Sequence, residues 1–314
     1  MGRQWPRAII FPSARFRKQM LYLRLQQSSA NVIPPTMSHS VPKSRTSPFP
    51  RRIVCLSDEV VELIYLLGEQ DRIVGVSGFS VRPPEVRLKP RVSTFRDANF
   101  DSIAQLEPDL IITYSDVQAE NTREASLRGF TVLNCNQRSI AEIFETIAMV
   151  SRILGKQDDG DALIASYASR LERIAAAAPK VSHRPRVFFE EWNDPIISGI
   201  EWVEELIEIA GGELIFPELR KRRKAKDRMV QWESVIERNP DVIFASWCGM
   251  KVNVEQITSR PRANEIAAIR LGQIFEIPSS LILQPGPAAL TDGVDQLHAL
   301  LAKVANRAAR MPQG

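Results

Sequence analysis

The chain has 314 residues, 44% of them hydrophobic, which is long enough for two domains and normal for a soluble globular protein. No run of about 18 apolar residues occurs, so we expect no membrane-spanning segment. The net charge of +4 comes from the first 50 residues, which hold eight Lys/Arg and no acid; the remainder carries 41 − 8 = 33 basic and 37 acidic residues. The folded part therefore gives no reason to expect a nucleic-acid partner.

Cysteine and histidine residues are few and widely spaced. They are Cys55, Cys135, Cys248, His39, His183 and His298. The spacing argues against a disulfide framework and against a zinc site, because neither a CxxC pair nor a ligand-spaced histidine pair is present. We expect no metal site and no intrinsic cofactor.

Residues 1–51 predict a disordered extension or a wrongly assigned start. The apolar stretch from Ala8 to Phe11 is too short for a secretory signal and is interrupted by Pro12. An Arg-rich start without acids also fits an organellar transit peptide, and Met37 is an alternative initiator. The sequence leaves the true start open.

Residues 52–157 alternate between short apolar runs and helical spacing. Strands are expected at 52–56, 73–76, 110–113 and 131–133, and helices at 59–67, 117–128 and 140–154. Because these strands are apolar throughout, we expect a parallel sheet covered by helices on both faces.

A long helix, expected over 161–178, has no strand close behind it and separates this lobe from the next. We assign 158–184 to the interlobe helix and linker, and 185–310 to a second lobe. Strands are expected there at 186–189, 242–245 and 273–277, with helices at 203–210 and over roughly twenty C-terminal residues. The fold class is therefore α/β, with two Rossmann-like lobes of parallel sheet joined by a single long helix.

One motif occurs twice, at residues 99–112 and 231–244, and its matches lie 132 positions apart. Each copy has an amide residue, an aromatic residue, an acid, a serine and then Pro-Asp before an apolar run. The acids are Asp101 and Glu233. An acid in the first turn of a helix is stabilised by the helix dipole, but the dipole does not require the same position in both lobes. A matched pair also suits docking to a partner with two related basic sites.

Five aromatic residues fall in the predicted loops: Phe79, Phe95, Tyr114, Trp192 and Trp247. Each one is explained equally well by packing between the lobes. Together they favour the lining of a ligand site, because loops at strand ends meet between α/β lobes and aromatic rings supply large flat contacts.

No catalytic constellation is present. Nucleophile elbows, P-loops and GxGxxG turns are all missing. Glu190 and Glu191 are adjacent in a predicted strand, so their side chains point to opposite faces and do not form an acid/base couple. We expect a protein that is not an enzyme.

The basic segment, residues 220–226, has three interpretations. A solvated surface loop is favoured over a rim that attracts an anionic ligand, and a nucleic-acid patch is least favoured because no aromatic residues interleave it. Lys226 and Arg228 are the best candidates for ligand contact.

Over about residues 52–306, the chain resembles the cobalamin and iron-chelate binding proteins of ABC importers. The resemblance rests on Arg52-Ile53-Val54, Val74-Gly75-Val76-Ser77, Val92-Ser93-Thr94-Phe95, Pro108-Asp109-Leu110-Ile111 and Pro240-Asp241-Val242-Ile243. Ser198-Gly199 and Pro285-Gly286-Pro287 make the cobalamin-binding branch the most similar.

The resemblance implies two lobes that close little around their ligand, and an acid from each lobe that pairs with arginines of a permease dimer. Asp101 and Glu233 occupy those positions. It also places pocket residues at Phe79, Phe95, Tyr114, Ser280 and Gln284, with two departures: a pocket tryptophan is replaced near Asp227, and an acid in the last loop by Ser280. The full expected ligand-contact set is Phe79, Arg82, Phe95, Tyr114, Trp192, Lys226, Arg228, Trp247, Ser280 and Gln284.

We therefore expect a monomeric, non-catalytic protein that binds a corrinoid or related metal chelate in the cleft between its lobes for an ABC importer. The alternative is a cytosolic enzyme or chaperone that handles such a chelate, with Cys248 either a metal-binding thiolate or an ordinary buried thiol. The resemblance favours the periplasm, whereas the lack of a recognisable signal peptide favours the cytoplasm; both stay open.

Overall fold

The computed structural model describes residues 48–94, 96–178 and 184–310. The fold begins at Phe49, the first residue of a compact unit. Phe95 and nearly all of the predicted N-terminal extension, including Met37, lie outside the described residues.

The first sheet is wholly parallel, with strand order β3-β2-β1-β4-β5. Its strands are β1 (Ile53–Cys55), β2 (Ile73–Ser77), β3 (Arg91–Ser93), β4 (Leu110–Tyr114) and β5 (Val132–Cys135). The helices around it are α2 (Asp58–Leu66), α3 (Phe100–Gln105), α4 (Ala119–Leu127) and α5 (Ile140–Ile153). We call this part the first lobe.

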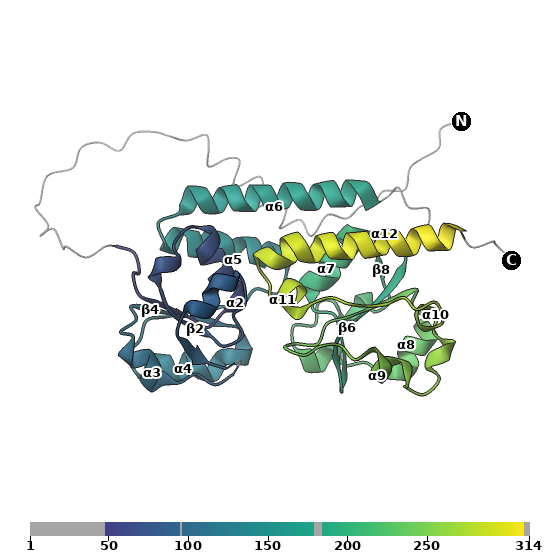
Figure 1. The fold of residues 1–314 in the computed structure, drawn as a ribbon, viewed down its shortest axis with the longest axis horizontal. Coiled ribbons are helices and arrows are strands. Elements are labelled where there is room, and N and C mark those ends of the chain that lie inside the picture. Colours follow the sequence, from purple (N-terminus) through teal and green to yellow (C-terminus); the bar gives the residue numbers. More distant parts are fainter. Residues whose placement is uncertain (1–47, 95, 179–183, 311–314) are drawn as a thin grey trace, which may run out of the picture. The chain divides into compact units, whose positions relative to one another are not determined.

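Both faces of the first sheet are buried, as the apolar strands predict. Phe100 and Ile103 of α3 and Ala125 of α4 pack in one cluster with Val54 and Ile111 of the sheet. Helices α2 and α5 contact each other and lie on the opposite side (Figure 1).

The second sheet has the order β10-β9-β6-β7, with β8 also paired to β6. Its strands are β6 (Arg186–Asn193), β7 (Ile196–Ser198), β8 (Glu213–Leu214), β9 (Val242–Ala245) and β10 (Ile274–Glu276). Its helices are α7 (Glu201–Ala210), α8 (Trp232–Arg238), α9 (Val254–Thr258) and α10 (Ala267–Arg270). We call this part the second lobe.

The second sheet is mixed, which refines the expectation of parallel sheets. Strand β6 continues to Asn193 and turns back through Asp194-Pro195 into β7, which pairs antiparallel to it. A two-residue connection permits only an antiparallel neighbour, because a parallel crossover needs a dozen or more residues. The other pairs of this sheet, β6 with β8 and β9 and β9 with β10, are parallel.

The repeated motif builds the same helix–turn–strand unit in both lobes: α3 into β4, and α8 into β9. Glu107 and Asn239, which are 132 positions apart, both have left-handed backbone angles, with φ of 44° and 39°. Such a residue ends a helix. The aspartate that follows has a structural role: Asp109 accepts bonds from the backbone N–H groups of Arg51 and Arg52 at 2.7 and 3.0 Å, and Asp241 accepts one from Arg186 at 2.8 Å.

Helix α6 (Gln157–Ala177) is the longest helix described and follows α5 directly. The chain then leaves β10 through α11 (Ser279–Ile282) and a π-helical turn (Ala289–Gly293) into α12 (Val294–Arg310). Helix α12 packs on α7 and also contacts α6 (Figure 1). The fold class predicted from the sequence is confirmed, whereas the exact lobe boundaries stay predictions. None of the described helices has the length and apolarity needed to cross a membrane.

Candidate ligand-binding site

Candidate site residues of both lobes lie towards the carboxyl ends of parallel strands, where α/β folds bind ligands. Asp58 follows β1, Phe79 follows β2 and Tyr114 ends β4. In the second lobe, Glu191 lies in β6 and Cys248 follows β9. These five residues define the candidate site.

The lobes touch at Phe79 and Gly249. A Cβ atom added to Gly249 would lie 3.2 Å from the Phe79 ring, so the ring meets the backbone of the second lobe directly. Gly249 has a φ of +70°, a left-handed conformation that glycine adopts without strain. Its N–H also donates to Ser279 Oγ at 3.4 Å. Phe79 remains 45% exposed, and its contact with a ligand stays a prediction.

Asp58 links the first lobe to the C-terminal segment through uncharged donors. Its Oδ1 accepts from Ser80 Oγ at 2.5 Å, and its Oδ2 accepts from Gln284 Nε2 at 3.4 Å. Burial raises the pKa of the Asp58 carboxyl to about 6, against the opposing effect of its serine donors. The structure thus places Gln284, an expected contact residue, beside an acid that the sequence did not single out.

Glu59, the next residue, is buried. Its Oε1 accepts from Ser57 Oγ at 2.6 Å and from Gln137 Nε2 at 3.0 Å. Gln137 also donates to the Pro285 carbonyl at 3.1 Å. Burial raises the pKa of Glu59 to about 7, so this carboxyl is partly protonated near neutral pH.

Tyr114 carries a buried hydroxyl that has no hydrogen-bond partner within the described part of the chain. The Arg138 guanidinium lies over its ring, 5.4 Å from the centroid, and also pairs with Asp116 at 2.6 Å. Burial raises the pKa of Tyr114, and the negative charge of Glu191 from the other lobe adds to the rise. The Tyr114 phenol is therefore neutral at the end of β4.

Glu191 and Arg228 form an ion pair in the second lobe. Arg228 Nη1 and Nη2 lie 2.6 and 3.1 Å from the two Glu191 oxygens, and Arg228 also donates to the Ser198 carbonyl. Arg228 is only 1% exposed, so its guanidinium lies below the surface and holds Glu191 in place. Contact of Arg228 with a ligand stays a prediction.

Trp247 is also buried. Its side chain belongs to the core of the second lobe, and Nε1 donates to buried Glu190 at 3.2 Å. Glu190 pairs with Arg260 at 2.5 Å, so adjacent Glu190 and Glu191 have separate partners, as their alternation along a strand predicts. Trp247 therefore packs inside the second lobe, and its contact with a ligand stays a prediction.

Trp192 is half-buried and packs against the same core. Its Nε1 donates to the Asp194 carbonyl at 2.9 Å, which fixes the ring beside the β6–β7 turn. Ser280 is half-buried in α11, close in sequence to Gln284. Contact of Trp192 and Ser280 with a ligand stays a prediction.

Cys248 is exposed, which corrects its interpretation as a buried thiol. Desolvation, with the charges of Glu191 and Asp58, raises its pKa, so it is a neutral thiol at neutral pH. No cluster of three or more metal-ligating side chains occurs within the described residues.

Arg82 is engaged in structural pairs. It lies 3.0 Å from Glu62 of α2 and 2.8 Å from Asp292 of the π-helical turn. Glu62 Oε2 in turn accepts from the Ala288 N–H at 3.2 Å. Arg82 therefore ties the loop after β2 to the C-terminal segment; its expected contact with a ligand is untested.

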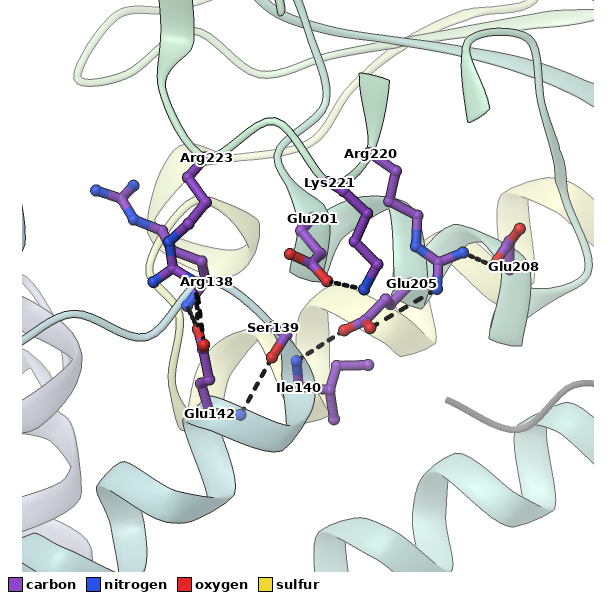
Figure 2. Close-up of polar contacts among 10 residues, drawn as sticks. All are labelled: Arg138, Ser139, Ile140, Glu142, Glu201, Glu205, Glu208, Arg220, Lys221 and Arg223. Carbon is purple, nitrogen blue, oxygen red and sulfur yellow. Dashed lines mark hydrogen bonds and ion pairs between the residues drawn. The ribbon is translucent and has the colours of Figure 1, made fainter. Parts of the chain in front are cut away.

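Residues 221–226 are exposed, in line with the favoured interpretation of a solvated loop, and three members of the basic segment also pair with acids. Lys221 lies 2.5 Å from Glu201, and Arg220 contacts two further acids of α7 (Figure 2). Arg223 reaches an acid of the first lobe (Figure 2). Lys226 is exposed and stays a candidate for ligand contact.

The twin acids lie on the outside of their helices. The Asp101 side chain is 87% exposed and pairs with Arg128 at 2.8 Å. Glu233 is exposed in the first turn of α8. Both positions are open to a partner, and their predicted docking role is untested.

The chain matches the family model described as periplasmic binding protein over residues 53–281. It belongs to that family. Among its relatives are the vitamin B12-binding protein of Vibrio cholerae, 28% identical over 273 residues (85% of this chain, 94% of that protein), and an ABC transporter substrate-binding lipoprotein of Bacillus subtilis, 26% identical over 261 residues (79% of each chain).

Solved structures of family members share the fold. The periplasmic vitamin B12-binding protein of Vibrio cholerae superposes with a TM-score of 0.66 and 25% identity, covering 82% of this chain and 98% of that one. A periplasmic heme-binding protein of Pseudomonas aeruginosa superposes with a TM-score of 0.71 and 18% identity, covering 81% and 93%. At 18% identity the second likeness bears on the fold alone.

Proposed function

We propose that this protein is a non-catalytic carrier that binds a corrinoid between its two lobes and delivers it to an ABC importer. Family membership supports the carrier role, and the vitamin B12-binding relative supports the ligand class. Phe79 from the first lobe offers an exposed aromatic face next to the second lobe. The alternative of a cytosolic chelate-handling enzyme gains no support from any of these observations.

The observation that carries the choice of ligand is Asp58, a carboxylate that lies after β1 at the edge of the first sheet where α/β folds bind ligands. The donors to Asp58 are uncharged, so its negative charge is balanced by no cation among them. Carboxylates accept strong hydrogen bonds from N–H groups. A corrin ring carries amide side chains around its edge and can supply such donors.

Asp58 also disfavours a porphyrin, whereas the charge of Glu191 is already balanced by Arg228. Haem carries propionate carboxylates, and like charges in a partly buried site repel one another. Arg138 and Arg228 do not offset this, because each already pairs with an acid of its own lobe. The site therefore favours an uncharged, amide-bearing chelate over an anionic one.

Selectivity between cyanocobalamin and hemin tests this assignment. We expect Asp58→Asn to lower the ratio of the two affinities by about tenfold, because an amide accepts a weaker hydrogen bond and no longer repels propionates. Asp71→Asn, at an exposed position in the turn before β2, is the matched control and leaves the ratio unchanged. An unchanged ratio in Asp58→Asn would remove the basis for preferring a corrinoid.

Delivery to an importer requires that the protein leave the cytoplasm and dock on a permease. We propose that Asp101 and Glu233 are the docking contacts, because they occupy matched, exposed positions in the two lobes. Docking by exposed charges accelerates and orients association more than it adds affinity.

A further inference from the structure

Arg223 crosses from the second lobe to the first. Its Nη1 lies 3.0 and 3.3 Å from the two Glu142 oxygens, and its Nη2 donates to the Asn136 carbonyl at 3.0 Å. Figure 2 shows the side chain directed at the start of α5. Two acceptors that belong to one short segment of the other lobe give this contact a defined geometry.

A second bond joins the lobes at the same place. The backbone N–H of Ile140, in the first turn of α5, donates to Glu205 Oε2 at 2.7 Å. Glu205 lies in α7 of the second lobe and is buried, and burial raises its pKa to about 7. The N-terminus of α5 is thus held by both a cation and an acid of the second lobe.

The basic segment is itself anchored before it reaches across. Lys221 pairs with Glu201, and Arg220 lies 3.7 Å from Glu205 and also pairs with Glu208 (Figure 2). All three acids belong to α7. Residues on either side of Arg222 are therefore fixed, whereas Arg222 and Lys224 are exposed and take no part in any ion pair within the described residues.

From Glu142 the contacts continue to the candidate site. Glu142 Oε2 accepts from the Arg138 N–H at 2.7 Å, and Ser139 caps α5 by accepting from the Glu142 N–H at 3.2 Å. The Arg138 side chain then lies over Tyr114. A series of contacts therefore connects Arg223 to Tyr114 through Glu142 and Arg138.

We propose that the basic segment is a clamp that fixes the separation of the two lobes, with Arg223 as the positioning residue that sets the site around Tyr114. We assign the pair a positional role and not a stabilising one. The Arg223 and Glu142 side chains are 47% and 26% exposed, and an exposed ion pair adds little stability. The effect on lobe separation is independent of the ligand, whereas the effect on affinity rests on the proposed corrinoid function.

Lobe separation is measured by pulsed electron paramagnetic resonance on the full chain without ligand. Spin labels go on Ser126→Cys in α4 and Ser259→Cys after α9, both exposed, in a Cys248→Ser background that leaves only buried cysteines. Arg223→Gln removes the clamp, and Arg222→Gln removes the same charge next to it. We expect a broader distance distribution for Arg223→Gln and the parent distribution for Arg222→Gln. Identical distributions in both variants would overturn the clamp.

Affinity provides the second readout, with native cysteines restored. We expect Arg223→Gln to weaken cyanocobalamin binding by about three- to tenfold, and Glu142→Gln, which keeps an oxygen to accept from the Arg138 N–H, to do the same. The double variant should lose no more than either single one, because both remove one contact. Additive losses would overturn the coupling. If the parent binds no cobalamin, the corrinoid assignment fails, and the distance measurement still decides the clamp.

Discussion

Glu59 and Gly286 are in contact although 227 positions separate them. A Cβ atom added to Gly286 would lie 2.6 Å from the Glu59 Cβ and 3.4 Å from its Cα, so only glycine lets the C-terminal segment pass the start of α2. Because Cβ and Cα cannot move aside by a change of rotamer, we expect Gly286→Ala to lower the free energy of unfolding by about 1–3 kcal/mol.

Chemical denaturation of Gly286→Ala and of Ser279→Ala checks this expectation. Ser279 lies in the same segment, and its side-chain Oγ accepts a long bond of 3.4 Å from the Gly249 N–H, so loss of the hydroxyl should change the stability by less than about 0.5 kcal/mol. A Gly286→Ala variant as stable as the parent would show that the segment can shift away from α2.

The Glu204 carboxyl makes stability depend on pH. Burial raises its pKa to about 8 from an ordinary value of 4.5, against the opposing charges of Arg228 and Arg220. The folded protein therefore binds this proton more tightly than the unfolded chain, so Glu204 lowers the free energy of unfolding as pH rises from about 4.5 to about 8. Glu204→Gln has no such loss. The free energy of unfolding of Glu204→Gln minus that of the parent should therefore be about 1–3 kcal/mol larger at about pH 8.5 than at about pH 5.

Urea denaturation of the parent and Glu204→Gln at the two pH values measures the difference. Glu213→Gln, at an exposed position in β8, is the control and should follow the parent at both. Parallel pH profiles for Glu204→Gln and the parent would mean that Glu204 is ionised in the folded protein throughout.

Arg228 and Lys226 are two positions apart and should behave differently. Arg228→Leu leaves Glu191 without its buried partner, and we expect a loss of about 3 kcal/mol. Adding Glu191→Leu should restore part of the loss, because no unpaired charge then remains. Lys226→Gln, at an exposed position, should stay within about 0.5 kcal/mol of the parent. Thermal denaturation ranks the variants, and equal stabilities for Arg228→Leu and Lys226→Gln would contradict the buried pair.

Substitutions at Asp101 and Glu233 test docking separately from ligand binding. We expect Asp101→Ala with Glu233→Ala to reduce cobalamin uptake by a cognate importer in proteoliposomes at least about tenfold, since like-positioned charges steer association. Affinity for the ligand should not change, because both residues lie on the outside of α3 and α8. Exposed Glu120 and Glu237, changed together to Ala, control for the loss of negative charge. Normal uptake with the Asp101→Ala, Glu233→Ala double variant would refute the docking role.

Much of the fold follows from local sequence signals. The twin motif predicts its two helix–strand units because a left-handed residue and Pro-Asp end each helix in the same way. The antiparallel β7 was missed because Ile196-Ile197-Ser198 is too short to carry a period, and its pairing depends on a turn at Asp194-Pro195.

The candidate site is harder to predict from the sequence, because the burial of each side chain and its hydrogen-bond partners decide whether it is available to a ligand. From the sequence, Trp247 and Arg228 look like exposed loop residues. In the structure, Trp247 packs in the core of the second lobe and Arg228 pairs with Glu191. Asp58 was available as a signal, since an acid directly after a buried strand lies at the edge where ligands bind. The sequence carries no comparable signal for the clamp, because Arg223 and Glu142 are 81 positions apart.

The central claim is that the two lobes hold a corrinoid. Isothermal titration calorimetry of the purified protein with cyanocobalamin, and separately with hemin, tests it most directly. We predict a saturable heat at one cyanocobalamin per chain with a Kd below about 10 μM, and binding of hemin at least about tenfold weaker. No heat with cyanocobalamin at about 50 μM protein, or tighter binding of hemin, would contradict the account.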